Sequence, residues 1–168
     1  MTKKLPVITA PNPILRQKAI KVENFNDELR EFLDQLEYTT VTSKNCGGLA
    51  ANQVGYSQHA FIMNMDRDKK PYKMVNLEIL KYSDKTCMWT EGCMSFPDIW
   101  LEIERPESVL VRYMDEFGKT HEEQFSGGEA RNIQHELDHL NGILMIDTFS
   151  KDRQDFIMRK IKKTKPKV

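Results

Sequence analysis

The chain lacks any apolar run of the roughly 20 residues that a membrane-spanning helix requires. Its charged start is followed by no apolar stretch of signal-peptide length. Three cysteines, an odd number, form neither a disulfide framework nor a paired C-x-x-C zinc site. We therefore expect a soluble protein of a reducing compartment such as the cytoplasm, with no membrane partner. An organellar location is compatible with the sequence if a transit peptide has been removed.

The chain also lacks an excess of charge of either sign, because 25 Lys and Arg residues balance 25 Asp and Glu residues. No overall field therefore attracts nucleic acid, and we expect no specific nucleic-acid partner. Locally the balance fails, since the segment from Arg159 to Val168 contains no acid and six cations: Arg159, Lys160, Lys162, Lys163, Lys165 and Lys167. A solvated tail is one explanation. Docking to an RNA-rich surface is the other.

No internal repeat, low-complexity linker or break in composition divides the 168 residues. This length suits one domain with a sizeable core, so we expect residues 1–168 to form a single domain with a basic tail from about residue 159.

The spacing of apolar residues predicts helices at both ends of an α+β domain. Asn26 or Asp27 can cap a helix whose apolar stripe is Leu29, Phe32, Leu33 and Leu36, and which ends before the loop at 43–48. A last amphipathic helix is predicted from about Lys151 to Lys163. Strand-like runs cover 59–65, 72–81 and 108–113, and 119–125 returns as a hairpin. We expect antiparallel strands packed around a central helix, with an N-terminal and a C-terminal helix.

That central helix carries His135-Glu136-Leu137-Asp138-His139, an H-E-x-x-H pattern. Residues i and i+4 of a helix share a face, so both imidazoles can reach one metal ion while Glu136 stands beside it. Gly127-Gly128 precedes the helix and Asn141-Gly142 is a plausible end. A buried stripe would place the histidines along its flank, at a cleft wall: Ile133, Leu137 and Leu140. The pattern favours a metal-dependent hydrolase; two solvated histidines on a charged helix are the alternative.

A catalytic metal site needs a third protein ligand and one open position. Cys93 is the best candidate, because Gly92 permits a close backbone approach and Ser95, Phe96 and Pro97 suggest a loop that turns away. A lone cysteine is more often a small buried hydrophobe. We expect that role for Cys46 and Cys87, and for Cys93 both interpretations stay open.

Three ordered motifs resemble those of the peptide deformylases, which remove the formyl group from the N-terminal methionine of new bacterial and organellar proteins. The usual G-x-G-L-A-A-x-Q corresponds to residues 46–53, CGGLAANQ; the usual E-G-C-L-S to residues 91–95, EGCMS; and Q-H-E-x-D-H to residues 134–139, QHELDH. Flanking segments are similar as well, so the resemblance spans nearly the whole chain. Three positions depart from the family pattern: Cys46 replaces a glycine, Met94 a leucine and Leu77 a common proline. None removes a catalytic group.

The resemblance implies a metal held by Cys93, His135 and His139, with Glu136 as general base and acid for attack by metal-activated water (hydroxide) on the formyl carbon. Oxyanion donors would be the Gln53 side-chain amide and the Met94 backbone N–H. Peptide-binding positions would be Gly48, Gly92, Trp100 and Asn132, although Trp100 could equally be an exposed or core-packing residue.

The cofactor implied is one divalent metal, natively Fe²⁺, which Zn²⁺, Ni²⁺ or Co²⁺ can replace. The partners implied are nascent formyl-methionyl peptides, with the ribosome as a further partner of the basic tail. Asp138 could orient a neighbour of the metal ligands or be a surface charge, and Arg131 could line the pocket or be a structural ion-pair partner.

Two other functions share part of this pattern. A zincin metalloprotease also uses H-E-x-x-H, but its third ligand is a downstream Glu or His rather than an upstream cysteine. A structural metal site or an RNA- or ribosome-binding protein would leave Glu136 and Gln53 without a role, and a structural site is usually closed by four protein ligands.

Overall fold

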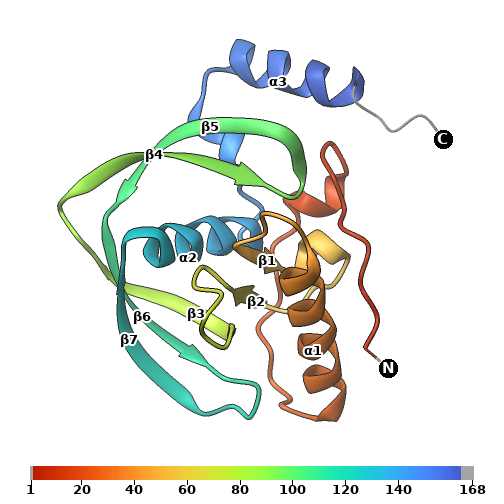
Figure 1. Cartoon of the computed structure of the whole chain (residues 1–168), viewed down its shortest axis with the longest axis vertical. Coiled ribbons are helices and arrows are strands. Elements are labelled where there is room, and N and C mark those ends of the chain that lie inside the picture. The colour runs from red at the N-terminus through yellow and green to blue at the C-terminus, as the bar shows by residue number, and fades with distance from the viewer. Residues whose placement is uncertain (1, 164–168) are drawn as a thin grey trace.

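The computed structural model describes residues 2–163, and two antiparallel sheets enclose a central helix, α2 (Gly127–Leu140) (Figure 1). One sheet has five strands in the order β1-β2-β3-β6-β7, and the other is the β4–β5 hairpin. Helix α1 (Asp27–Thr42) lies beside the first sheet, and α3 (Lys151–Lys163) lies outside the hairpin. The predicted α+β fold with antiparallel strands is confirmed.

The N-terminal helix α1 forms where its apolar stripe and cap predict it. The Asn26 side chain accepts a hydrogen bond from the backbone N–H of Leu29 at 3.0 Å, which satisfies one of the free donors of the first turn. The stripe residues are all buried against the five-stranded sheet: Leu29, Phe32, Leu33 and Leu36.

The five-stranded sheet confirms the four predicted strands and adds one. Its strands are β1 (Gly48–Ala50), β2 (Ala60–Met63), β3 (Tyr72–Tyr82), β6 (Ser108–Met114) and β7 (Thr120–Ser126). The edge strand β1 belongs to the first sequence motif and was not predicted. It is only three residues long and buried throughout, so it shows no alternation of apolar and polar residues.

The loop expected around Cys93 was wrong. Strand β4 (Thr86–Cys93) pairs with β5 (Phe96–Pro106) along nearly its whole length, from Thr86 opposite Pro106 to Cys93 opposite Phe96. The register shifts between Gly92 and Cys93, so Cys93 lies at the irregular end of a strand, directly before the tight turn. Glu91 takes a buried position of β4, so the strand lacks the alternation of apolar and polar residues by which strands are predicted.

Helix α2 begins and ends close to the predicted residues, with Asn141 at its C-terminal cap and Gly142 at φ 72°. Ile133 and Leu140 are buried as expected. The histidines, however, do not lie on a half-exposed flank: His135 is 7% and His139 2% exposed. The helix is covered on one side by β1, β2, β6 and β7 and on another by β5, so its polar motif is enclosed between the sheets.

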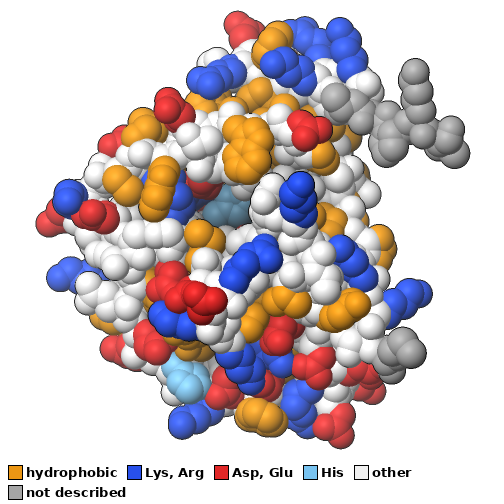
Figure 2. All heavy atoms as spheres, viewed as in Figure 1, with side chains coloured by type: hydrophobic (Ala, Val, Ile, Leu, Met, Phe, Trp, Pro, Cys, Tyr) orange, Lys and Arg blue, Asp and Glu red, His pale blue; other side chains and the backbone are white. Residues whose placement is uncertain are grey.

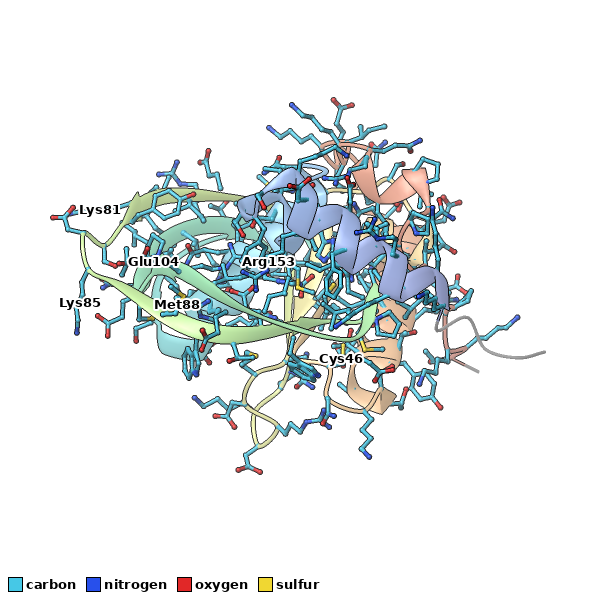
Figure 3. The ribbon with its side chains drawn as sticks, turned by 90° about the horizontal axis from the view of Figure 1, so that it is seen from above. Cys46, Lys81, Lys85, Met88, Glu104 and Arg153 are labelled. Atoms are coloured by element: carbon cyan, nitrogen blue, oxygen red, sulfur yellow. The ribbon has the colours of Figure 1, made fainter. Side chains whose placement is uncertain are left out.

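The last helix, α3, packs on β5 through Ile157 and Ile161 and contains the first part of the basic segment. In Figure 3 it lies in front of the β4–β5 hairpin, with Arg153 among its exposed side chains. Residues 159–163 are therefore helical rather than a loose tail, while Lys165 and Lys167 lie outside the described residues. No helix within residues 2–163 combines the length and apolar character needed to cross a bilayer.

Candidate metal centre

Three donor atoms from two elements meet between the sheets. Cys93 is delivered by the end of β4, and His135 and His139 by successive turns of α2. Their ligand atoms all lie within 4.8 Å of one another, and Cys93 Sγ is 3.2 Å from His139 Nε2. Sulfur and imidazole nitrogen form a donor set that suits Zn²⁺, Fe²⁺, Co²⁺ or Ni²⁺. No other group of three potential ligands occurs in the described part of the chain.

His135 is oriented by a buried carboxylate. Its Nδ1 lies 2.9 Å from Glu91 Oε1, which leaves Nε2 available as a ligand. Glu91 also receives hydrogen bonds from Arg105, at 2.6 and 3.0 Å, and from Arg131 at 2.6 Å. Burial alone would raise the pKa of Glu91, but the bonds from His135 and Arg105 outweigh it and lower that pKa to about 2. Glu91 is therefore a carboxylate at any physiological pH.

The structure assigns contacts to two residues whose roles the sequence left open. Asp138 accepts a hydrogen bond from Arg105 at 2.8 Å, so it positions the arginine that donates to Glu91. Arg131 donates to the carbonyl oxygens of Ile103 and Cys87 at 2.8 and 2.7 Å, which fastens both hairpin strands to α2. Arg131 also lines the cavity, so it is an ion-pair partner and a pocket residue at once.

His139 has a different environment from His135. Its Nδ1 is buried and has no hydrogen-bond partner among the described residues. Burial, together with the neighbouring His135, holds the pKa of His139 well below its usual value. His139 is thus neutral, which is the form that binds a metal ion.

Glu136 stands next to the three donors with one oxygen free. Its Oε1 lies 3.3 Å from the Asn132 amide, whereas its buried Oε2 has no partner within the described chain. Burial raises the pKa of Glu136 to about 7. A carboxyl group with such a pKa can accept and return a proton near neutral pH.

Gln53 contacts the cysteine of the same donor group. It lies in a 3₁₀ turn, η2 (Ala51–Val54), and its Oε1 accepts a hydrogen bond from the Ala50 backbone at 2.9 Å. Its amide Nε2 is thereby aimed at Ser95 Oγ (3.1 Å) and Cys93 Sγ (3.6 Å). Met94 follows Cys93 directly and is partly buried against the core. The Gln53 amide therefore flanks the thiol, and Met94 is the next residue along the chain.

A cavity of about 750 Å³ opens beside these residues. Figure 2 shows histidine surface (pale blue) at the floor of the hollow, with apolar and basic side chains around its rim. All four predicted peptide-binding residues line it: Gly48, Gly92, Trp100 and Asn132. Trp100 is 61% exposed, so it is not a core residue.

Gly48 and Gly92 lie so close to neighbouring side chains in the cavity that a larger residue would not fit at either position. A Cβ on Gly48 would lie 2.8 Å from Glu136 Oε1, and one on Gly92 would lie 2.5 Å from the Trp100 ring. The backbone N–H of Asn64, the residue after β2, donates to the Gly47 carbonyl. In an antiparallel pair the next residue, Gly48, therefore directs its N–H and C=O to the free edge of β1. An extended peptide could pair with that edge.

Sequence reasoning gave no role to Arg105 or Asn52, although Asn52 donates a hydrogen bond to the His139 carbonyl. The position of Asn52 in the first motif, beside Gln53, is the sequence feature that could have indicated a role for it.

The two other cysteines differ in burial. Cys46 has the buried position expected of it, at 2% exposure. Cys87 is only partly buried, so the expected core role for it was wrong.

An H-E-x-x-H helix, an upstream cysteine and a free carboxylate in one cavity define a metallohydrolase site. The family model for polypeptide deformylase matches residues 4–155. The chain therefore belongs to the polypeptide deformylase family, metal-dependent hydrolases that remove N-terminal formyl groups.

Known relatives agree along almost the whole chain. A peptide deformylase of Brucella suis is 40% identical over 94% of this chain and 91% of its own length. Peptide deformylase 1 of Rickettsia conorii is 38% identical over 96% of both chains. The crystal structure of the Ehrlichia chaffeensis peptide deformylase in complex with actinonin is 31% identical, covers 98% of this chain and 99% of its own, and gives a TM-score of 0.93.

Proposed function

We propose that this chain removes the formyl group from the formyl-methionine of nascent peptides, using one divalent metal held by Cys93, His135 and His139. The observation that carries the proposal is the convergence of those ligand atoms within 4.8 Å, next to the free oxygen of Glu136. The donor set fits a catalytic metal, because three protein ligands leave one position open.

When bound, the metal supplies Lewis acidity that lowers the pKa of water and polarises the formyl carbonyl. Glu136 accepts the proton of the attacking water at Oε2 and returns it to the leaving amine. The Gln53 amide and the Met94 backbone N–H donate to the oxygen on which negative charge develops. Gly48 pairs with the extended peptide, and Gly92, Trp100 and Asn132 form the walls around its first side chain. Loss of one oxyanion donor, as in Gln53→Ala, is expected to cost about 3–4 kcal/mol of barrier.

The native metal we propose is Fe²⁺, with Zn²⁺, Ni²⁺ or Co²⁺ able to replace it. Cys93 is partly exposed to the cavity, so an iron-loaded centre should be sensitive to oxygen through oxidation of this thiolate. We further propose a cytoplasmic location.

A zincin protease explains the site less well. Its third ligand follows the helix, whereas here the nearest sulfur donor comes from β4, upstream of α2. Glu91 and Gln53 also orient this donor set directly, and the zincin pattern gives them no role.

Formate release from formyl-Met-Ala-Ser by anaerobically purified, Fe²⁺-loaded protein tests the proposal. Wild-type protein should turn over, and Glu136→Gln and Cys93→Ala should each lose activity, the second together with its metal. Lys18→Gln, an exposed change, serves as the control. Absence of formate from protein with one metal bound per chain would contradict the proposal and direct the search to unformylated peptides.

We also propose that the basic end of α3 associates with the ribosome, where nascent chains emerge. Arg159, Lys162 and Lys163 are exposed, and residues 156–163 contain no acid, while Ile157 and Ile161 on the same helix are buried. Changing these three cations to Gln leaves the packing intact and should weaken salt-sensitive co-sedimentation with ribosomes. The matched control changes Lys3, Lys18 and Lys21 to Gln. Equal co-sedimentation of both triple variants at low salt would rule the proposal out.

A further inference from the structure

The two histidine ligands are held in unequal ways, and the difference points to a residue outside the three ligands and Glu136. A metal-bound histidine almost always donates its second ring nitrogen to a partner that fixes the ring. His135 follows this rule through Glu91, whereas His139 Nδ1 has no partner within the described residues. Among the described residues, the orientation of His139 is thus set by its packing and by its backbone.

The backbone of His139 is held by a side chain from a distant part of the sequence. Asn52 Nδ2 donates to the His139 carbonyl oxygen at 2.5 Å, across 87 residues. Asn52 is 3% exposed, and it lies in η2 directly beside Gln53. One short turn thus contacts both ligand-bearing elements: Gln53 reaches Cys93 on β4, and Asn52 reaches His139 on α2.

His139 lies in the last turn of α2, where helix carbonyls have no partner within the helix. Backbone N–H groups of 141–143 and Ala19 satisfy the carbonyls around it, and Gly142 N donates to the His139 carbonyl at 3.0 Å. Among the described residues, Asn52 is the only side chain that donates a hydrogen bond to a backbone carbonyl of this last turn. A shift of this turn would move the imidazole relative to Cys93, which lies only 3.2 Å from it.

We propose that Asn52 is a positioning residue of the metal centre, which fixes His139 through its backbone in place of the ring partner that His139 lacks. This inference rests on the proposed metal site. Its prediction is specific: loss of the Asn52 amide should weaken metal retention more than it weakens folding. Partners of this kind typically contribute 10–100-fold to metal affinity.

Zinc release from loaded protein to a coloured chelator gives the first measurement, and the visible spectrum of the Co²⁺-loaded protein gives the second. Asn52→Ala removes the donor, and Asn52→Asp places an acceptor against the carbonyl at nearly constant shape. Both should raise the zinc dissociation constant about 10–100-fold, Asn52→Asp more, and both should shift the Co²⁺ bands. Neither readout depends on turnover.

The matched control is Asn76→Ala. Asn76 makes two hydrogen bonds of 2.8 Å to the backbone of Val22, away from the cavity. Its loss should lower the melting temperature but leave zinc release and the Co²⁺ spectrum unchanged. If both Asn52 variants release zinc as the wild type does, the inference about Asn52 is overturned while the proposed function stands. A wild-type chain that binds no zinc would overturn it together with the proposed function.

Discussion

At the scale of single residues, Cys46 shows how the chain departs from its family without disturbing the site. The left-handed residue of its loop is the neighbouring Asn45, at φ 57°, so position 46 does not require glycine. Its thiol donates to the Gly48 carbonyl at 3.2 Å, and burial raises the pKa of Cys46 to about 12. The neutral thiol is thus a small core side chain and a hydrogen-bond donor.

Cys46→Gly should therefore destabilise the protein although glycine is the usual family residue. The loss of a buried side chain and the added freedom of the unfolded chain should together lower the free energy of unfolding by about 1–2 kcal/mol. Urea unfolding measures this change, and Cys46→Ser, which keeps a donor, should lose less. A Gly variant as stable as wild type would show that the thiol contributes nothing to packing.

At the scale of elements, the β4–β5 hairpin depends on α2 for its attachment beside the cavity. Arg131 bonds to Glu91 and to carbonyls of both strands, and its guanidinium lies 5.7 Å from the Trp89 ring centre. Its side chain is only 8% exposed, so these charges are poorly screened. Figure 3 shows Met88 and Glu104 on the part of the hairpin that lies near Lys85.

Arg131→Met should keep the bulk of the side chain but remove its charge and donors. Breaking a buried ion pair costs about 3–5 kcal/mol, and the lower end applies here because Arg105 and His135 still bond to Glu91. Thermal or urea unfolding measures the loss. Arg112→Met, which removes an exposed arginine with two surface ion pairs, is the control and should cost under 1 kcal/mol. Equal losses in the two variants would contradict this account of the hairpin.

The same hairpin is the part of the fold that local sequence patterns did not predict. The helices α1, α2 and α3 and the strands β2, β3, β6 and β7 follow local periodicity, and local patterns were sufficient to predict them. Glu91 was invisible as a strand residue because the two arginines that permit its burial come from other elements, at 105 and 131. The H-E-x-x-H spacing predicted two donors, but only the folded chain shows Asn52 on His139 and Arg105 on Glu91.

At the scale of the whole molecule, the candidate centre joins parts that lie in different sheets and far apart in the sequence. Cys93 belongs to the two-stranded sheet, while His135 and His139 lie on the helix that packs against the five-stranded sheet. A metal bound by all three would cross-link the sheets through α2. Because the ligands are far apart in sequence, the unfolded chain cannot offer the same site, so metal binding should favour the folded state.

Metal removal should consequently lower the melting temperature of the whole protein rather than loosen one loop. At free metal about 100-fold above its dissociation constant, the stabilisation is about 2.7 kcal/mol. For a chain of 168 residues this corresponds to a shift of about 5–10 °C. Differential scanning calorimetry of metal-loaded and chelator-treated protein measures the shift. Cys93→Ala should melt at nearly the same temperature with and without metal, because two imidazoles alone bind it weakly. A wild-type melting temperature that ignores metal would show that the three donors do not hold it as a unit in the folded chain.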